Sequence, residues 1–268
     1  MKPQRHPLMR KALTDSWRSP LGWGIGLLAI MSLYLPLYPS IGGSAQMREL
    51  LASLPQEMIK ALNYDQIASG PGYTQATFFG LTGFLLMSIA AISWGAAAIG
   101  GDEEAGLLEL TLAHGVTRTQ VVLERAAALV IRMLVLAALV LAVILALNGP
   151  AQLGIDPAKV FAGVLMFVLL TLLGGTGALV AGALSGRRMY GIVAGTAIAV
   201  VGYVFNALGN QSEDLAWLHN FSPYYWAYGR SPLVDGVPWA AAAGLCGLSI
   251  AFVAVSVLAL RHRDVGAS

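Results

Sequence analysis

The chain has 268 residues, of which 57% are hydrophobic and only 11% are charged; its net charge is +2. A soluble globular domain carries about 25% charged residues, so the composition excludes that class and predicts an all-α polytopic membrane protein. A β-barrel would instead show alternating segments of about ten residues. The only cysteine, Cys246, excludes an intrachain disulfide.

Residues 8–18 predict a short amphipathic helix on the inner surface of the membrane. Basic amphipathic helices lie at the depth of the lipid headgroups. The helix either anchors the chain to the membrane, or contacts a lateral gate of the membrane domain or a protein that drives it. The sequence leaves both open. Its apolar positions have helical spacing and its basic positions point away from them: Met9, Ala12, Leu13 and Trp17, against Arg10, Lys11 and Arg18.

Six apolar stretches are long enough to cross a hydrocarbon core of about 30 Å, which takes about 20 helical residues. A single transmembrane domain would then occupy residues 1–268. No cleavage site follows the first stretch, so we expect it to remain as a span. The stretches cover about residues 20–41, 76–100, 127–148, 158–184, 190–209 and 237–260.

The loop 42–75, between the first two stretches, predicts one or two short amphipathic helices at the outer face. After the second stretch, residues 102–114 predict a short cytoplasmic helix. Acidic residues at its start favour the helix dipole, and Gly115 terminates it. Thr117 and Gln120 are spaced as a capping box for the next helix. The apolar side chains along one face of this helix must be buried, either against the underside of the bundle or against a partner protein.

The third and fourth stretches each carry one unusual feature. Arg132 lies about one turn inside the third, where it either snorkels to the inner interface or has a function. Along one face of the fourth, small residues permit close approach of another helix, in this chain or a second one. They are Gly174, Ala178, Gly182 and Gly186.

The loop 210–236 gathers aromatic residues around Pro223. Tyr and Trp are enriched at membrane interfaces, so these side chains either anchor the loop or form a rim along which an amphipathic cargo leaves. The rim residues are Trp217, Phe221, Tyr224, Tyr225 and Trp226.

Basic residues gather near the termini and in the two short loops after the second and fourth stretches. An excess of Lys and Arg marks the cytoplasmic side, so both termini and residues 101–118 are predicted to be cytoplasmic. The basic residues therefore set topology and do not indicate a nucleic-acid partner. On the opposite side lie only Arg48, Lys60, Lys159 and Arg230.

The sequence carries no motif for catalysis. No phosphate-binding loop occurs, the four histidines lack metal-ligand spacing, and no Ser/His/Asp arrangement is evident. The long apolar stretches hold no carboxylate, whereas ion-driven transporters usually keep one at mid-membrane. We therefore expect no catalytic residue, no metal site and no cofactor in this chain, and an external source of energy for any transport.

Residues 101–113 (Gly-Asp-Glu-Glu-Ala-Gly-Leu-Leu-Glu-Leu-Thr-Leu-Ala), followed by Val116-Thr117-Arg118, resemble the signature of type 2 ABC exporter permeases. In that family an E-E…G-T-L-E-L-L-L…P-V-S-R segment follows the second span. This sequence departs by having Leu107 at the Thr position and Gly115 at the Pro position. The amphipathic start, the six spans, Ser222-Pro223-Tyr224 and the terminal residues 261–264 are also similar.

The resemblance implies the membrane subunit of an ATP-driven exporter of antibiotics, drugs or lipids in the plasma membrane. It implies a second permease subunit, homo- or heterodimeric, and separate ATPase subunits that bind ATP and Mg. Alternatives are an ion-coupled secondary transporter and a non-transporting scaffold or sensor subunit. The residues that would contact the ATPase are Asp102, Glu103, Glu104, Gly106, Leu108, Glu109, Leu112 and Arg118.

Overall fold

A computed structural model describes residues 7–41 and 67–263, together with Ser44, Gln46, Glu49, Ser53 and Pro55 between them. The helices expected in the loop 42–75 lie largely outside the described residues. Throughout the described part the regular structure is helical, without strands. Six helical stretches are long and apolar enough to cross a membrane, which confirms the predicted fold class. They are Arg18–Leu37, Gly70–Glu104, Arg118–Asn148, Pro157–Ser185, Arg188–Gly209 and Trp239–His262.

The first two long stretches each combine several elements, the other four are single helices, and short helices lie between them. The first half of the chain forms α1 (Pro7–Asp15), α2 (Arg18–Tyr34), η1 (Leu35–Leu37), α5 (Gly70–Thr74), η3 (Gln75–Thr82), α6 (Gly83–Ala96), η4 (Ala97–Gly101), α7 (Asp102–Glu104), α8 (Leu107–Ala113) and α9 (Arg118–Asn148). The second half forms α10 (Pro157–Ser185), α11 (Arg188–Gly209), η5 (Glu213–Phe221), α12 (Pro223–Tyr228), α13 (Pro232–Asp235) and α14 (Trp239–His262).

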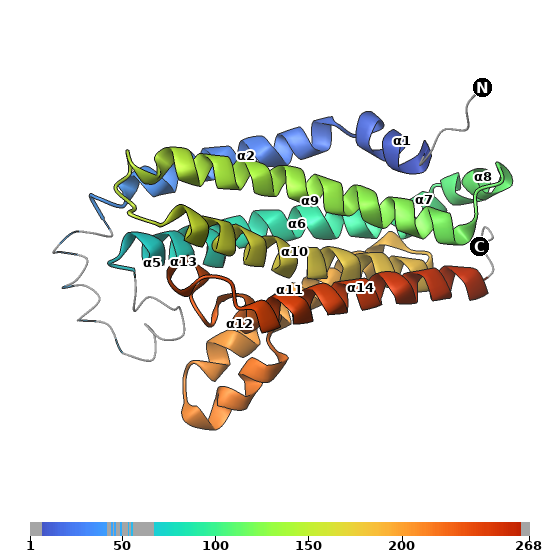
Figure 1. Ribbon diagram of the computed structural model, residues 1–268. Helices are drawn as coiled ribbons and strands as arrows, with labels where there is room; N and C mark the ends of the chain where they lie inside the picture. Colours follow the sequence, from blue (N-terminus) through green and yellow to red (C-terminus); the bar gives the residue numbers. More distant parts are fainter. Residues whose placement is uncertain are drawn as a thin grey trace.

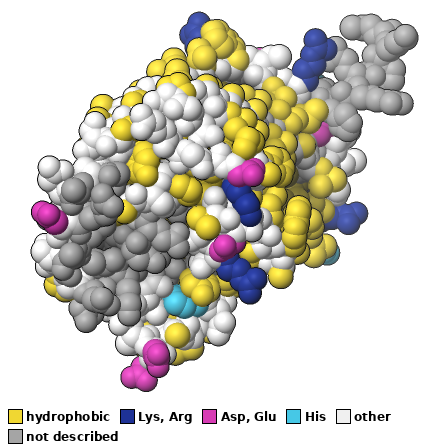
Figure 2. Space-filling model, turned by 60° about the vertical axis from the view of Figure 1, so that its left-hand side comes forward, with side chains coloured by type: hydrophobic (Ala, Val, Ile, Leu, Met, Phe, Trp, Pro, Cys, Tyr) yellow, Lys and Arg dark blue, Asp and Glu magenta, His cyan; other side chains and the backbone are white. Residues whose placement is uncertain are grey.

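The long helices run side by side, with the short helices at the two ends of the bundle (Figure 1). α1, α7 and α8 lie at one end, together with the last residues of α14; we call this the α8 end. α5, α12 and α13 lie at the other, the α12 end. Charged side chains appear as isolated groups on a surface made mostly of hydrophobic and uncharged side chains (Figure 2).

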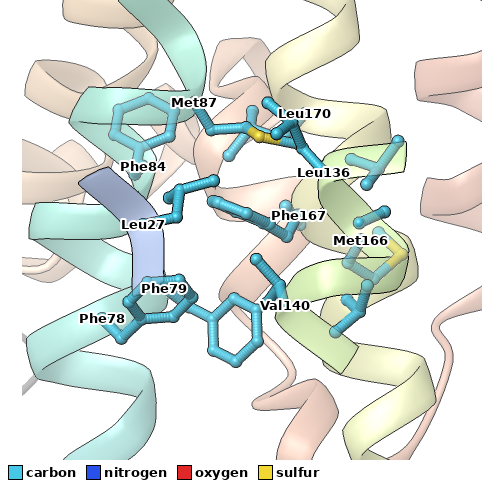
Figure 3. Close-up of a cluster of buried hydrophobic side chains, with 14 of the residues drawn as sticks. Leu27, Phe78, Phe79, Phe84, Met87, Leu136, Val140, Met166, Phe167 and Leu170 are labelled. Carbon is cyan, nitrogen blue, oxygen red and sulfur yellow. The ribbon is translucent and has the colours of Figure 1, made fainter. Parts of the chain in front are cut away.

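The centre of the bundle is α10, which packs against α6, α9, α11 and α14. Side chains from α2, η3, α6, α9 and α10 point toward one another in the core (Figure 3). Phe167 of α10 meets Phe79 of η3 edge to face, with ring centroids 5.3 Å apart, and Phe78 lies 5.8 Å from Phe167. Edge-to-face packing of this kind adds about 0.5–1.5 kcal/mol to the burial of each aromatic pair.

The small residues of α10 lie against helices of the same chain. A Cβ atom added to Gly195 of α11 would lie 2.7 Å from the carbonyl oxygen of Gly174, and one added to Gly182 would lie 3.3 Å from the backbone nitrogen of Gly100. Ala178 is fully buried between α6 and α11. The close approach that small residues permit is therefore used inside the described bundle.

Gly186 differs from the other three small residues. It lies just after α10 at φ +71°, as the left-handed cap that ends this helix, and its amide donates to the carbonyl of Gly182. Glycine adopts this conformation without the steric cost of a Cβ atom. Gly186 therefore lies one residue beyond the helix face predicted for it, but its surroundings are close: a Cβ atom there would lie 2.7 Å from the Oε1 atom of Glu103.

α9 begins at Arg118, nine residues before the predicted start of the third span at 127. The reason is the cap: the Oγ1 atom of Thr117 accepts a hydrogen bond from the amide of Gln120, at 3.2 Å. At about 1.5 Å per residue, the 31 residues of α9 span about 46 Å. That exceeds the hydrocarbon core of about 30 Å, so part of α9 lies outside the hydrocarbon core.

Candidate functional site

The segment between the second and third spans forms two helices instead of the single helix predicted over 102–114. After α7 the chain leaves the helical conformation at Ala105, and Gly106 takes φ +67° before α8 begins. A residue without a Cβ atom adopts this backbone conformation readily. At the other end, Gly115 at φ +80° follows α8, as expected for a helix terminator.

The two faces of α8 have different surroundings. Leu108 is 1% exposed and packs in a buried cluster with Ile99, Val121 and Leu260, and Leu112 packs against the same cluster. The prediction that Leu108 contacts the ATPase was therefore wrong, because its side chain is buried inside this chain. The apolar side chains that α8 leaves open are Leu107, 51% exposed, and Leu110, 59% exposed.

The three acidic residues of α7 each connect to a different helix. Asp102 forms an ion pair with Arg125 of α9, and Glu103 forms one with Arg263, just after α14. Glu104 accepts a hydrogen bond from the backbone amide of Arg188, the first residue of α11, at 3.1 Å. Sequence analysis gave these residues an effect on the helix dipole and, by resemblance, a contact with the ATPase; it did not give their partners within the chain, which lie 23 to 160 positions away.

Arg118 closes the same network from the start of α9. One of its terminal nitrogens donates to the carbonyl oxygens of Leu260, Arg261 and Arg263, at 3.0, 3.2 and 2.6 Å. The last carbonyls of a helix have no partner within the helix, and a cation there also favours the helix dipole. Arg118 thus caps the end of α14. Glu109 lies exposed on α8.

A groove of about 720 Å³ separates α8 from α1. Lys11 and Asp15 of α1 line one side, and Leu107, Leu110 and His114 line the other. α1 is held in place by Glu124, a buried residue of α9 whose Oε2 atom accepts a hydrogen bond from the amide of Met9 at 2.8 Å. The exposed leucines of α8 therefore face a groove with mixed charge, closed on its inner side by the bundle.

Arg132 does more than reach toward the membrane surface. One terminal nitrogen donates to the carbonyl oxygen of Ala12 in α1 at 2.5 Å, and the guanidinium lies 5.4 Å from the ring centre of Trp94 in α6. Cation–π contacts form within about 6 Å of the ring centre. Arg132 therefore joins α9 to α1 and α6, which the sequence did not indicate.

The aromatic residues of the α12 end divide into two groups. Trp217 and Phe221 are exposed, whereas Tyr224 is 6% exposed and packs against Phe84 and Tyr203. The hydroxyl of Tyr224 donates to the carbonyl oxygen of Gly80 in η3, at 2.8 Å. The prediction that Tyr224 lies on a surface rim was wrong, because its ring fills the core.

The remaining two rim residues are half-buried. Tyr225 stacks on His219, with ring centroids 3.8 Å apart, and Trp226 donates through its ring nitrogen to the carbonyl oxygen of Asn220, at 3.2 Å.

Burial raises the pKa of Tyr224 above its usual value of 10.0, since a phenolate loses its hydration there. Its hydroxyl therefore stays protonated and available as a donor.

A groove of about 240 Å³ opens between α6 and α11. Its walls are almost entirely apolar, and its polar lining side chains are Ser88, Thr196 and Tyr203. Among the described residues there is no group of three or more His, Cys, Asp or Glu side chains that could hold a metal ion.

Residues 7–265 match the family described as ABC-2 family transporter protein. The chain belongs to the ABC-2 family. The match covers α1, all six spans and the α7–α8 segment, so it confirms the resemblance that residues 101–118 indicated. As an ABC-2 permease, the chain is a multi-pass membrane component of a transporter. Neither the curated proteins nor the solved structures gave a match.

Proposed function

We propose that this ABC-2 permease is the membrane subunit of an ATP-driven exporter in the plasma membrane. Its α8 end, with both termini, faces the cytoplasm, as the distribution of Lys and Arg predicts. ATP and Mg²⁺ bind to separate ATPase subunits, since this chain has no phosphate-binding loop. A second permease subunit completes the pathway.

The observation that carries this proposal is the difference between the two faces of α8. Leu108 fixes one face to the bundle, and Leu107 and Leu110 on the other face lie open beside the groove under α1. Two large exposed leucines on a water-facing helix favour a protein partner that buries them. An ATPase seated there would contact a helix whose opposite side is already packed against Val121 of α9 and Leu179 of α10.

The cargo of the exporter is an amphipathic or apolar compound, such as an antibiotic, a drug or a lipid. The groove between α6 and α11 supports this class because its lining is apolar with a few hydroxyl groups. Ligand sites for such compounds combine apolar walls with a small number of polar groups. The described carboxylates of the span helices, Asp102, Glu103, Glu104 and Glu124, all lie at the α8 end, away from mid-membrane.

The test is to replace Leu107 and Leu110 together by Asp and to isolate the permease from its native membrane. An unpaired charge in a buried contact costs about 3–5 kcal/mol, which corresponds to at least a hundredfold in affinity. We expect normal abundance in the membrane, because both side chains are exposed, together with loss of the copurifying ATPase and of ATP-dependent transport into inverted vesicles.

Leu123→Asp is the matched control. Leu123 is 50% exposed near the start of α9 and does not line the groove between α1 and α8, so this variant should keep its ATPase. If the double variant keeps its ATPase and its transport, the proposed contact is wrong. If no ATPase accompanies the wild-type chain, and transport follows an ion gradient without ATP, the exporter proposal is wrong.

A further inference from the structure

A second pocket, of about 210 Å³, lies on the bundle side of α1, between α1, the start of α2, the end of α6 and α9. It shares Ala12, Ser16, Asp102 and Arg125 with the groove between α1 and α8, so the two hollows adjoin. Arg132 and Trp94 line its deeper part. The proposed docking of an ATPase on α8 leaves this pocket without a role.

The charges in the pocket do not balance. Two guanidinium groups, of Arg125 and Arg132, line it with a single carboxylate, of Asp102, which pairs with Arg125. The contacts of Arg132 are a backbone carbonyl and an aromatic ring, and neither carries a formal negative charge. A net positive charge in a partly desolvated site is unfavourable unless an anion joins it.

The pocket also holds hydrogen-bond donors that a ligand could use. The Nε atoms of Arg125 and Arg132 are both buried and have no hydrogen-bond partner among the described residues. Polar atoms that are buried without a partner are rare in folded proteins. The hydroxyl of Ser19 accepts a hydrogen bond from the ring nitrogen of Trp94 at 2.9 Å, so its own proton is free to point at a ligand. Guanidinium and hydroxyl donors together suit phosphate oxygens.

The depth of the pocket fits a lipid phosphate, given the orientation proposed above. Arg132 is 14 residues after the start of α9, which is about 21 Å along the helix. If the excess length of α9, about 16 Å, lies on the cytoplasmic side, Arg132 is about one turn inside the hydrocarbon. Its side chain then extends back to headgroup depth, where the amphipathic α1 and Trp94 also belong.

We propose that this pocket binds a phosphate group, carried by an anionic phospholipid headgroup of the inner leaflet or by inorganic phosphate from the cytoplasm. The anion completes the charge balance of Arg125 and Arg132 and bridges α1 to α9. Because α1 forms one wall of both hollows, an occupied pocket also fixes one wall of the groove beside α8.

The experiment compares ligands that differ only in phosphate, on the purified full chain in a maltoside detergent. Native mass spectrometry measures retention of phosphatidic acid against diacylglycerol, and thermal unfolding measures the effect of inorganic phosphate against chloride at equal ionic strength. We expect a clear preference for the phosphate-bearing member of at least one pair. Preference for phosphatidic acid alone identifies the lipid as the source, and preference for inorganic phosphate alone identifies a soluble source. No preference in either pair overturns the proposal.

Variants locate the binding site. Arg132→Gln should weaken binding at least about tenfold, since it removes charge-assisted hydrogen bonds, whereas Arg187→Gln should change it less than about twofold. Arg187 is an exposed cation at the same end of the bundle, outside the pocket. Equal losses in both variants would show general surface attraction and would overturn the site.

A second variant covers the case in which Arg132→Gln folds poorly. Ala97→Leu adds volume to the pocket from η4 and keeps every charge, so it should also weaken binding at least about tenfold. Binding of wild-type strength in a well-folded Ala97→Leu protein would place the phosphate elsewhere and contradict the proposal.

Discussion

The α8 end and the α12 end of the bundle are fixed by different chemistry, although the same long helices run between them. At the α8 end, Asp102 and Glu103 form ion pairs with Arg125 and Arg263, and Arg118 caps α14. At the α12 end, Tyr224 packs edge to face against three aromatic rings and donates one hydrogen bond to the backbone of η3.

The two kinds of contact respond differently to change. The paired side chains of the α8 end keep 14–24% of their surface exposed, so water and salt reach them and weaken their attraction. Tyr224 is buried, and the stability of its contacts depends on packing, which salt does not screen. The α8 end is therefore the part whose polar connections can be exchanged at low cost, which suits the contact with an ATPase proposed above.

The largest effect should come from a charge placed at the inner face of α8. Leu108→Asp puts a carboxylate into the cluster of Ile99 and Val121, and an unpaired buried charge destabilises by about 3–5 kcal/mol. We expect the protein to disappear from membranes on immunoblots. Leu107→Asp, one position away and exposed, should accumulate normally. Equal abundance of the two variants would contradict the difference between the faces.

A smaller loss of stability should follow when a methyl group is added between α6 and α10. A Cβ atom on Gly95 would lie 2.0 Å from the carbonyl oxygen of Gly175, so Gly95→Ala must separate the helices, at about 1–3 kcal/mol. Gly247→Ala meets no atom within 4 Å and should stabilise α14 slightly. Thermal unfolding in detergent measures both. Unfolding temperatures that shift in the same direction would show that α6 and α10 do not approach each other this closely.

Tyr224→Phe isolates the hydrogen bond of the α12 end from its packing. The ring stays, and the carbonyl of Gly80 loses its donor, at about 1 kcal/mol. The unfolding temperature should fall by the same amount at low and high salt. A loss that vanishes in high salt would mean that the two ends do not differ in the way described above.

The smallest effect should be the coupling between Glu103 and Arg263. A double-mutant cycle with Glu103→Gln and Arg263→Gln should give about 0.2–1 kcal/mol, because the pair is partly exposed. The coupling should shrink as salt rises from about 0.1 to 1 M. A coupling that salt leaves unchanged would show that this pair is as shielded from water as Tyr224.

The sequence predicted the six spans because each is set by a single local property, namely a length of apolar residues that matches the hydrocarbon. It also predicted the Thr117 cap and the break at Gly115, since both depend on residues within one helical turn. The early start of α9 follows from that same cap, whereas the predicted start at 127 followed hydropathy alone.

The inner and outer faces of α8 could not be told apart from the sequence. Leu108 and Leu112 are spaced i, i+4, and Leu107 and Leu110 are spaced i, i+3, so both pairs make an apolar stripe. Which stripe faces the bundle depends on how α8 approaches α9 and α10, which no local pattern encodes. For the same reason the position of Tyr224 was predicted wrongly and the role of Arg132 was left open. Their partners, Gly80 and Ala12, are more than 100 positions away.

α8 is joined to the backbone on either side through a glycine that no described side chain packs against. Gly106 and Gly115 both have positive φ, and a Cβ atom at either position would meet nothing within 4 Å; each amide donates a hydrogen bond only three residues back, to Glu103 and to Leu112. A partner that presses on Leu107 or Leu110 would therefore press Leu108 against its buried cluster, which includes Val121 of α9 and Leu179 of α10.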